Sequence, residues 1–455
     1  MKRYLVLVAA LLCGGATVQL GPTSTTENFD GIARDYVRQT LEIGEHDPGF
    51  VDAYYGPPEY LAAAKAGLRD ITQLRAATEA LLKRLETLRL GDPLDERRRS
   101  FLRGQLMAER TRLRMLAGEK SSFIQEARGL FGAVPDIKPL SAYSPVLARI
   151  AVLVPGNGSL ADRVDAYEDR FNIPATRIKP VMQAAIAECR RRTLKHISLP
   201  ANERFELELV TGKPWGGYNY YQGDAHSKIE INTDLPIRIG RAIDLGCHEG
   251  YPGHHVYNAL LEKNLTRQRG WAEFSVYPLY SPESLIAEGS ANYGIELAFP
   301  GDEQGTFERS ILYPLAGLPA AEADRYLALA KARRDLAGVR FTIVADYLDG
   351  KIDRAQAVQL TQQYQLESKA RAEKSMEFAD RYRSYIINYG LGLDMVRAYV
   401  EAAGPTQQAR WKRMEQLLSE PTTPADLLSR SSPPSSGSVT NQTQNRLTCC
   451  SGPRH

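Results

Sequence analysis

The stretch that decides the fold is HEGYPGHH, residues 248–255. It places three of the seven histidines of the chain within eight positions, beside a glutamate. Neutral imidazole is a preferred ligand of Zn²⁺, and histidines clustered with a carboxylate are typical of transition-metal sites. The stretch therefore predicts a fold built around a metal centre, with Zn²⁺ as the expected cofactor.

The spacing of the histidines requires a break in the helix that carries them. In the HExxH pattern of zinc peptidases the two histidines are four residues apart on one helical face. Here His254 follows His248 by six residues, which in a regular helix means about 9 Å of rise and about 240° of rotation. His255 follows by seven residues, with about 10.5 Å of rise. Because Pro252 removes a helical N–H and Gly253 relaxes the backbone, we expect a bulge that returns His254 to the ligand position, with His255 as the alternative.

A third ligand is expected from a helix further along the chain. Ser281 and Pro282 are typical of an N-cap and a first helical residue. Glu288 then falls in the middle of an apolar helix, where an unpaired carboxylate would be costly and a metal would compensate it. Asn292, one turn later, is placed to hydrogen-bond a ligand histidine. Glu296 is the fallback ligand.

The glutamate of the motif is the expected catalytic base. Glu249 adjoins His248 and points about 100° away on the helix. A carboxylate there can accept a proton from a water that Zn²⁺ has acidified and pass it to the leaving group. Candidates for the group that stabilises the oxyanion are Arg383, Tyr385, Tyr389 and His226.

The rest of the chain predicts a mainly α fold with one small sheet. Helical spacing of leucines covers much of residues 27–132, and it returns over 319–418. Between them, residues 205–232 alternate in polarity around a tyrosine-rich turn, which predicts a short antiparallel β-sheet beside the active-site helix. We expect this polar, aromatic segment to receive an extended peptide. Residues 47–60, rich in proline, glycine and tyrosine, are interpreted as a packed loop, with a substrate lip as the alternative.

Composition excludes several other classes of protein. The 455 residues are 43% hydrophobic and 24% charged, which is ordinary for a globular chain. The 57 basic and 54 acidic residues leave a net charge of only +3, so there is no electrostatic reason to expect a nucleic-acid partner. No segment has the apolar length of an integral membrane span.

The first residues are typical of an export signal. Lys2 and Arg3 precede an apolar run, residues 4–12, and small residues follow up to Ala16. We expect residues 1–16 to be a signal peptide and the protein to reach the bacterial periplasm. Anchoring as a lipoprotein through Cys13 is the alternative.

The cysteines do not suggest a disulfide framework. Of the five, Cys13 falls in the signal and Cys449 and Cys450 in a polar tail. The remaining pair, Cys189 and Cys247, is sparse for a framework, so we expect an exported protein without disulfides. Cys247 adjoins the first histidine; ligation is conceivable, but a buried helix cysteine is the preferred interpretation.

One folded unit is expected between the signal and the tail. Residues 27–428 would form a single helical catalytic unit, with an N-terminal helical subdomain over 27–200 as a further expectation. Residues 429–455 are rich in serine, proline, glycine and threonine and lack the apolar content to fold, so we expect a disordered tail.

Three motifs together resemble a known bacterial family. They are HEGYPGHH, AEGSANYGIE at 287–296, and the segment from Arg383 to Gly390. The chain from about residue 27 to 428 resembles domain-of-unknown-function family 885, which is grouped with the gluzincin metallopeptidases and carries an HExxPGH motif. The resemblance implies a zincin-like helical fold and hydrolysis of the peptidase kind.

By motif match, the resemblance assigns the site residues as well. It implies His248, His254 and Glu288 as metal ligands and Glu249 as the base. Asn292 stands where gluzincins commonly have aspartate.

The expected function is therefore zinc-dependent hydrolysis of a peptide or another small amide. One alternative is an amide or ester hydrolase that uses the same site on a non-peptide substrate. Another is a non-catalytic, metal-containing helical binding protein. Glu249 argues against the last, because a structural metal site needs no base.

Overall fold

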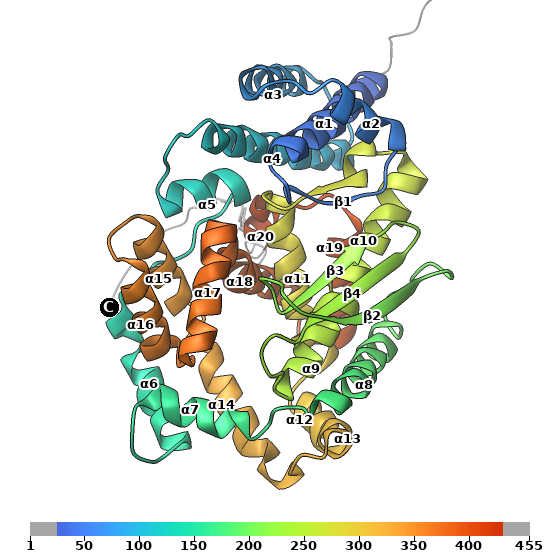
Figure 1. Cartoon of the computed structure of the whole chain (residues 1–455). Helices are drawn as coiled ribbons and strands as arrows, with labels where there is room; N and C mark the ends of the chain where they lie inside the picture. The colour runs from blue at the N-terminus through green and yellow to red at the C-terminus, as the bar shows by residue number, and fades with distance from the viewer. Residues whose placement is uncertain (1–24, 431–455) are drawn as a thin grey trace, which may run out of the picture.

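The computed structural model describes residues 25–430, and these are mainly helical (Figure 1). The predicted signal peptide, residues 1–16, and nearly all of the predicted tail lie outside the described residues. Ser429 and Arg430 belong to the last helix, α20 (Pro424–Arg430), so the folded part extends two residues past the predicted boundary. No helix of the described part is long and apolar enough to cross a membrane.

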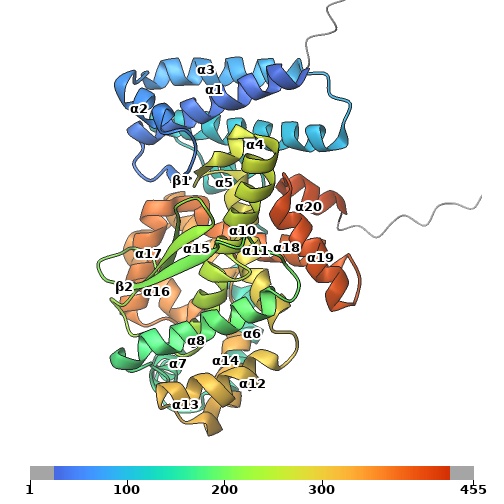
Figure 2. The same cartoon turned by 90° about the vertical axis from the view of Figure 1, so that its right-hand side faces the viewer.

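The N-terminal helices form one layer of the molecule, at the top of Figures 1 and 2. Two of them begin with a capping box. The side chains of Asp70 and Ser122 each accept a hydrogen bond from the backbone N–H of the glutamine three residues later, and that glutamine side chain accepts one from the backbone N–H of the capping residue. A separate apolar cluster, from Phe29 to Leu106 with Val276, holds the layer together. The helices are α1 (Thr25–His46), α2 (Pro58–Ala66), α3 (Ile71–Glu86), α4 (Pro93–Leu116) and α5 (Phe123–Phe131).

The small sheet that the sequence predicts lies beside the motif helix. Its strands are β2 (Arg204–Val210), β3 (Gly217–Tyr221) and β4 (His226–Asn232), in the order β2-β4-β3. The β3–β4 pair is antiparallel, as expected. The outer strand β2 pairs with β4 in parallel. From β2 the chain crosses to β3 at the opposite edge and then turns back, so that β4 lies between them and runs in the same direction as β2. β3 is therefore an edge strand.

A second, two-stranded sheet was not predicted. β1 (Val51–Tyr54) pairs antiparallel with β5 (Val276–Pro278). β1 lies inside the proline- and tyrosine-rich segment 47–60, whose turn residues hide a strand of four residues. This pairing joins the N-terminal layer to the start of the helix that carries Glu288.

The remaining helices comprise the central helix α11 (Pro282–Ala298) and the helices that surround it and the sheet. The surrounding helices are α6 (Ser144–Leu153), α7 (Leu160–Asp169), α8 (Ala175–Thr193), α9 (Gly240–Leu245), α10 (His254–Leu261), α12 (Glu303–Phe307), α13 (Tyr313–Ala316), α14 (Ala323–Arg334), α15 (Val339–Leu348), α16 (Arg354–Gln365), α17 (Lys369–Tyr382), α18 (Ile387–Glu401) and α19 (Gln407–Ser419). Short 3₁₀ segments cover Leu140–Tyr143, Ala272–Ser275, Ala320–Glu322 and Arg383–Ile386, and π-helical segments cover Gly246–Gly250, Glu262–Arg267 and Glu308–Leu312.

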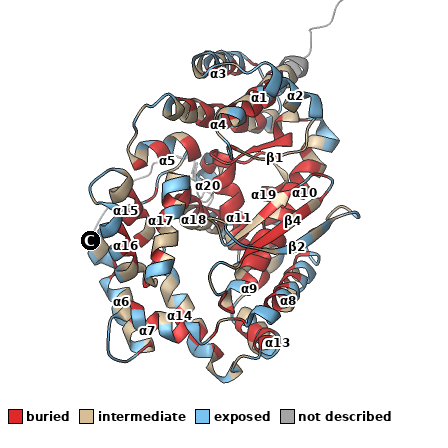
Figure 3. Ribbon diagram, viewed as in Figure 1, coloured by how far each residue is buried: buried red, intermediate tan, exposed pale blue. Residues whose placement is uncertain are grey.

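Helix α11 runs through the middle of the molecule and is buried on almost every side (Figures 1 and 3). A helix that is covered all round must be apolar or must pair its polar groups. It packs closely against α18, because a Cβ on Gly289 would lie 2.4 Å from the carbonyl oxygen of Gly392. Any larger residue at 289 would separate the helix that carries Glu288 from the helix that carries Tyr389.

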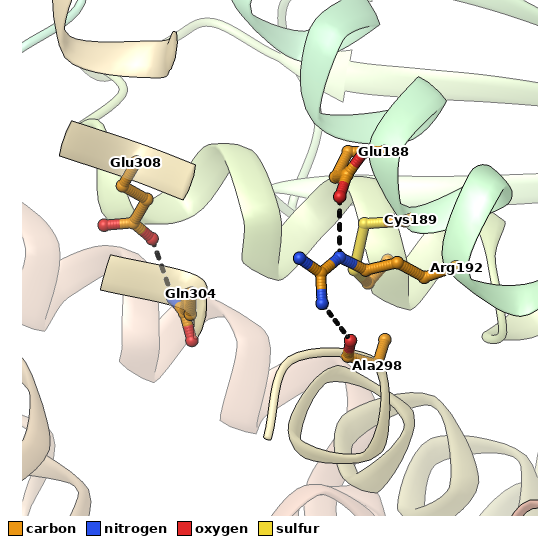
Figure 4. Close-up of a disulfide and its surroundings, with 7 residues drawn as sticks. Glu188, Cys189, Arg192, Ala298, Gln304 and Glu308 are labelled. Carbon is orange, nitrogen blue, oxygen red and sulfur yellow. Dashed lines mark hydrogen bonds and ion pairs between the residues drawn. A yellow bond between two sulfur atoms is a disulfide. The ribbon is translucent and has the colours of Figure 1, made fainter. Parts of the chain in front are cut away.

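The prediction that the chain has no disulfide is wrong. Cys189 on α8 and Cys247 in the π-helical segment are bonded, at a sequence separation of 58 (Figure 4). Both side chains are fully buried. Two cysteines so far apart in sequence carry no pairing signal; only the packing of α8 against the motif segment brings them within reach.

Candidate metal centre

The helix that carries the motif is broken, as the histidine spacing requires. Helix α9 passes into the π-helical segment Gly246–Gly250, the chain then leaves helical geometry, and α10 begins at His254. Gly253 donates its N–H to the carbonyl of Cys247 at 3.1 Å. A Cβ on Gly253 would lie 1.8 Å from the carbonyl oxygen of His248, so only glycine fits this reversal.

The break brings two imidazoles and a distant carboxylate together. The Nε2 atoms of His248 and His254 are 3.1 Å apart. Glu288 Oε2 lies 3.0 Å from His248 Nε2, and Glu288 Oε1 lies 3.8 Å from His254 Nε2. All three ligand atoms lie within 4.8 Å of one another.

The hydrogen bonds around the cluster allow His248 to present a lone pair to its inner face. Asn292 donates its amide N–H to the Tyr389 carbonyl at 3.3 Å, which turns its oxygen toward His248 Nδ1 at 3.2 Å. If Nδ1 of neutral His248 carries the ring proton, then Nε2 presents a lone pair to the cluster. Glu288 Oε2 is buried and lies 3.0 Å from His248 Nε2, with no other polar partner in the described part of the chain. Lone pairs and a carboxylate oxygen facing one point are the donor set that a divalent cation compensates, so the residues fit Zn²⁺.

The charge states of the cluster agree with this reading. Burial lowers the pKa of His254 to about 4, so its ring is neutral at neutral pH. For Glu288, burial alone would favour the neutral acid, but the contact with His248 outweighs it and holds the pKa below the usual value. For His248, burial alone would lower the pKa, but the Glu288 carboxylate outweighs it and raises the pKa. A metal bound here would displace the proton that His248 otherwise holds.

Glu249 occupies the position expected of a base. Its side chain is buried and faces the same cavity, and burial raises its pKa to about 7, with Glu288 adding to the effect and His248 opposing it. Asn219 on β3 donates its amide to the Glu249 carbonyl at 2.6 Å, which fixes the backbone of the motif to the edge strand. No hydrogen bond with the described residues engages the Glu249 carboxylate.

Two of the three C-terminal candidates are brought to the cluster. Tyr385 donates its hydroxyl to Glu288 Oε1 at 2.7 Å. The ring of Tyr389 lies nearly parallel to that of His248, with the centroids 6.3 Å apart. Burial raises the pKa of both phenols, and the nearby Glu288 carboxylate raises it further, so both remain protonated donors.

The structure does not bring Arg383 to the cluster, and there the prediction is wrong. Arg383 adopts φ 53° at the end of α17, and its Nε donates to Glu126 at 2.8 Å, away from the cavity. His226 faces Glu206 across the sheet at 3.3 Å. The fallback ligand Glu296 is held by both ends of the Arg397 guanidinium.

His255, the alternative ligand, lies in a different network. Its ring is fully buried; Nδ1 is 2.8 Å from the Ser227 hydroxyl, and Nε2 is 3.1 Å from Glu203 Oε2. Glu203 also accepts from the Tyr251 hydroxyl at 2.5 Å and from Arg190 Nε at 2.8 Å. The network is complete without a metal.

A large cavity gives access to the cluster. Its volume is about 1740 Å³, and it is lined by the three candidate ligands, Glu249, both tyrosines and the edge strand β3. Asp52 on β1 also lines it and accepts a hydrogen bond from the Tyr218 hydroxyl. Burial raises the pKa of Asp52 to about 8, with Glu288 and Glu249 adding to the effect. Nothing in the sequence pointed to Asp52, because it stands in a segment rich in turn residues.

Comparisons with known proteins bear on the fold. No family model matches the chain, and no curated protein matches it. A solved structure with a similar fold is described as "the putative lipoprotein from Colwellia psychrerythraea"; it matches with a TM-score of 0.50 over 91% of this chain and 77% of its own, at 16% sequence identity. At that identity the likeness concerns the fold, which is mainly helical with a small sheet.

Proposed function

We propose that the protein is a zinc-dependent peptidase with a zincin-like fold, in which His248, His254 and Glu288 hold the metal. The observation that carries the proposal is the convergence of these three side chains beside the Glu249 carboxylate, which no hydrogen bond from the described residues engages. A purely structural site has no use for such a base. Membership of family 885 is part of the same proposal, because its three motifs meet at one cavity.

Each residue of the cluster has a task in this reaction. When bound, Zn²⁺ supplies Lewis-acid chemistry: it polarises the scissile carbonyl and acidifies water. Glu249 Oε takes the proton of the attacking water and delivers it to the leaving nitrogen. Tyr389, a protonated phenol facing the cavity beside His248, is the donor best placed to stabilise the developing oxyanion.

Tyr385 and Asn292 act as positioning residues. The Tyr385 hydroxyl orients Glu288, and Asn292 sets the tautomer and orientation of His248. Groups of this kind raise the affinity of a metal site without touching the metal.

The sheet supports a peptide as the substrate. β3 is the edge strand and lines the cavity next to Glu249, so its free backbone groups can pair with an extended chain. Tyr218 and Trp215 stack on one another at this edge, with ring centroids 5.3 Å apart, and offer an apolar surface to substrate side chains.

Export belongs to the proposal as well. The N-terminal sequence is typical of a signal peptide, and the similar structure from Colwellia psychrerythraea is described as a "putative lipoprotein". The buried Cys189–Cys247 disulfide fits an oxidising compartment such as the periplasm.

Metal content and hydrolysis test the function together. We expect about one zinc per chain by elemental analysis, and cleavage of a peptide library that stops with a chelator and returns with zinc. Glu249→Gln should retain the zinc and lose activity by about 10²- to 10⁴-fold. The matched control is Glu296→Gln, which removes a carboxylate from the same cavity but one already paired with Arg397. A protein that holds no zinc after growth with it, or a fully active Glu249→Gln variant, contradicts the proposal.

A further inference from the structure

The cavity contains arginines that lack a carboxylate partner. Most of its half-buried cations are engaged: Arg112 pairs with Asp47, Arg238 with Glu168, and Arg333 with Glu168 and Glu367. Arg340 and Arg371 differ, because neither has an ion pair with any described residue. Leaving a guanidinium partly desolvated and unpaired is unfavourable, so an anion from outside the chain would be bound there.

Arg340 is the less satisfied of the two. Arg371 donates to the Pro236 carbonyl at 3.0 Å. Arg340 makes no hydrogen bond with the described residues, and its Nε is buried without a partner. Its guanidinium lies over the face of the Phe378 ring, with the guanidinium carbon 5.1 Å from the ring centroid. Burial lowers the pKa of Arg340, and the more distant Tyr389 and Glu367, neither of which forms an ion pair with it, oppose that effect without cancelling it.

Arg340 is also close to the proposed metal centre. The Phe378 ring, on which its guanidinium lies, packs edge-on against Tyr389 with centroids 6.1 Å apart. Tyr389 in turn lies against His248. Two aromatic rings therefore separate the guanidinium from a candidate ligand, and an extended peptide covers about 3.3 Å per residue. A group bound at Arg340 would stand only a few residues from the bond that is cut.

The neighbouring arginine strengthens the anion field. Arg371 precedes Phe378 by seven residues on α17, which is two turns along the same face. Both cations line the one cavity. The planar guanidinium of Arg340 offers two parallel N–H donors, which match a carboxylate better than a point charge would.

We propose that Arg340 binds the C-terminal α-carboxylate of a peptide substrate, so that the protein removes residues from the carboxyl end of short peptides. The proposal rests on the peptidase function, which it makes specific. The competing source of the same chemistry is an acidic side chain within the peptide, and the experiment separates the two.

Binding without turnover tests the anchor. Zinc-loaded Glu249→Gln protein is dialysed against three mixtures of N-acetylated random tetrapeptides: free acids, C-terminal amides, and amides that carry one glutamate. Retained peptides are measured by mass spectrometry. We expect free acids to be retained about ten- to a hundredfold better than plain amides, the range for a hydrogen bond to a charged group. Equal retention of acids and amides, no retention of any mixture, or retention of glutamate amides equal to that of free acids overturns the proposal.

Variants assign the preference to the residue. In the same background Arg340→Gln should abolish the preference for free acids, and Arg340→Lys should keep part of it. Arg334→Gln is the matched control, because Arg334 lines the same cavity but is exposed. Thermal melting and zinc content show that each variant is folded. A preference that survives in Arg340→Gln overturns the assignment; should that variant unfold, full preference in Arg340→Lys does the same.

Hydrolysis by the wild-type protein separates this inference from the function beneath it. We expect products shortened from the carboxyl end. Hydrolysis of acids and amides at equal rates would leave the peptidase standing and refute the anchor. No hydrolysis, together with a preference for free acids that depends on Arg340, would refute the peptidase and leave the anchor.

Discussion

Two neighbouring histidines belong to two different kinds of buried cluster. His254 faces His248 and Glu288. The Nε2 atoms of the two rings are 3.1 Å apart, and Glu288 Oε2 has no polar partner other than His248 among the described residues. His255 faces Ser227 and Glu203, where each ring nitrogen has an oxygen within hydrogen-bond distance. One cluster is open to a large cavity, and the other is closed.

The difference shows how a candidate metal site is distinguished from a structural histidine. Both clusters combine imidazole with a buried carboxylate, so residue types alone do not separate them. The closed network satisfies its donors and acceptors within the chain, as a stable core requires. In the open cluster two ring nitrogens lie 3.1 Å apart beside a buried carboxylate, an arrangement that a bound cation would stabilise.

The largest difference between the two clusters is expected when each histidine is removed in turn. We expect His254→Ala to lose zinc and all zinc-dependent hydrolysis while remaining folded, because the cluster needs each of its ligands. His255→Ala should keep its zinc and lose stability instead. Elemental analysis, activity and thermal melting of both variants give the answer. If His255→Ala loses the zinc and His254→Ala retains it, the assignment of the two clusters is reversed.

The Cys189–Cys247 disulfide anchors the backbone next to His248 in the open cluster. Cys247 precedes His248, and its bond to Cys189 holds the π-helical segment on α8. We expect the double variant Cys189→Ser, Cys247→Ser to lose about 2–4 kcal/mol of unfolding free energy, since the reduced unfolded chain is less constrained. Denaturant titration measures it. Wild-type protein titrated under reducing conditions is the control and should show a similar loss; an unchanged midpoint in both would contradict the prediction.

Substitution of Asn292 tests whether a hydrogen bond orients His248 in the open cluster. Its oxygen is the partner of His248 Nδ1. We expect Asn292→Ala to weaken zinc binding by about 10- to 100-fold, because the ligand ring loses its orientation. Asn292→Asp should restore affinity, since a carboxylate accepts the same N–H. Competition with a chromophoric chelator measures the constants, and an affinity unchanged in Asn292→Ala would show that His248 is held by packing alone.

The smallest effect is expected in the closed network, through pH. Burial alone would raise the pKa of Glu203, but the hydrogen bonds from His255, Tyr251 and Arg190 lower it to about 2. A folded pKa below the unfolded value contributes stability above about pH 4.5, and that contribution is lost as the pH falls toward 2. Glu203→Gln should therefore cost about 1 kcal/mol at pH 7 and show a flatter loss of stability in acid. Acid titrations followed by circular dichroism compare the two; parallel curves would count against the assignment.

Much of the candidate site could be predicted because the motif carries its own geometry. The six-residue spacing of His248 and His254 is incompatible with a regular helix, and Pro252 and Gly253 supplied the break. Glu288 stood out as a carboxylate in an apolar helix, and Asn292 as its neighbour one turn later. These inferences depend only on helical periodicity and on the cost of burying charge, both of which are local.

Other features had no local signal. Arg383 belonged to a promising segment, but the turn at its positive φ sends the side chain to Glu126. Asp52 and Arg340 reach the cavity from elements far from the motif. The mixed pairing of the small sheet depends on the path of the chain between its strands, which polarity alternation does not record.

Three features follow from the sequence alone: the mainly helical character of the chain, the break in its motif helix, and the choice of His248 and Glu288 as candidate ligands. The contacts of the folded chain add that His254 and not His255 joins them, that Cys189 bonds Cys247, and that Arg340, which has no ion pair among the described residues, lines the same cavity. The reason is physical: periodicity and burial cost act between residues a few positions apart, whereas a shared site is made by contacts between segments that the fold brings together.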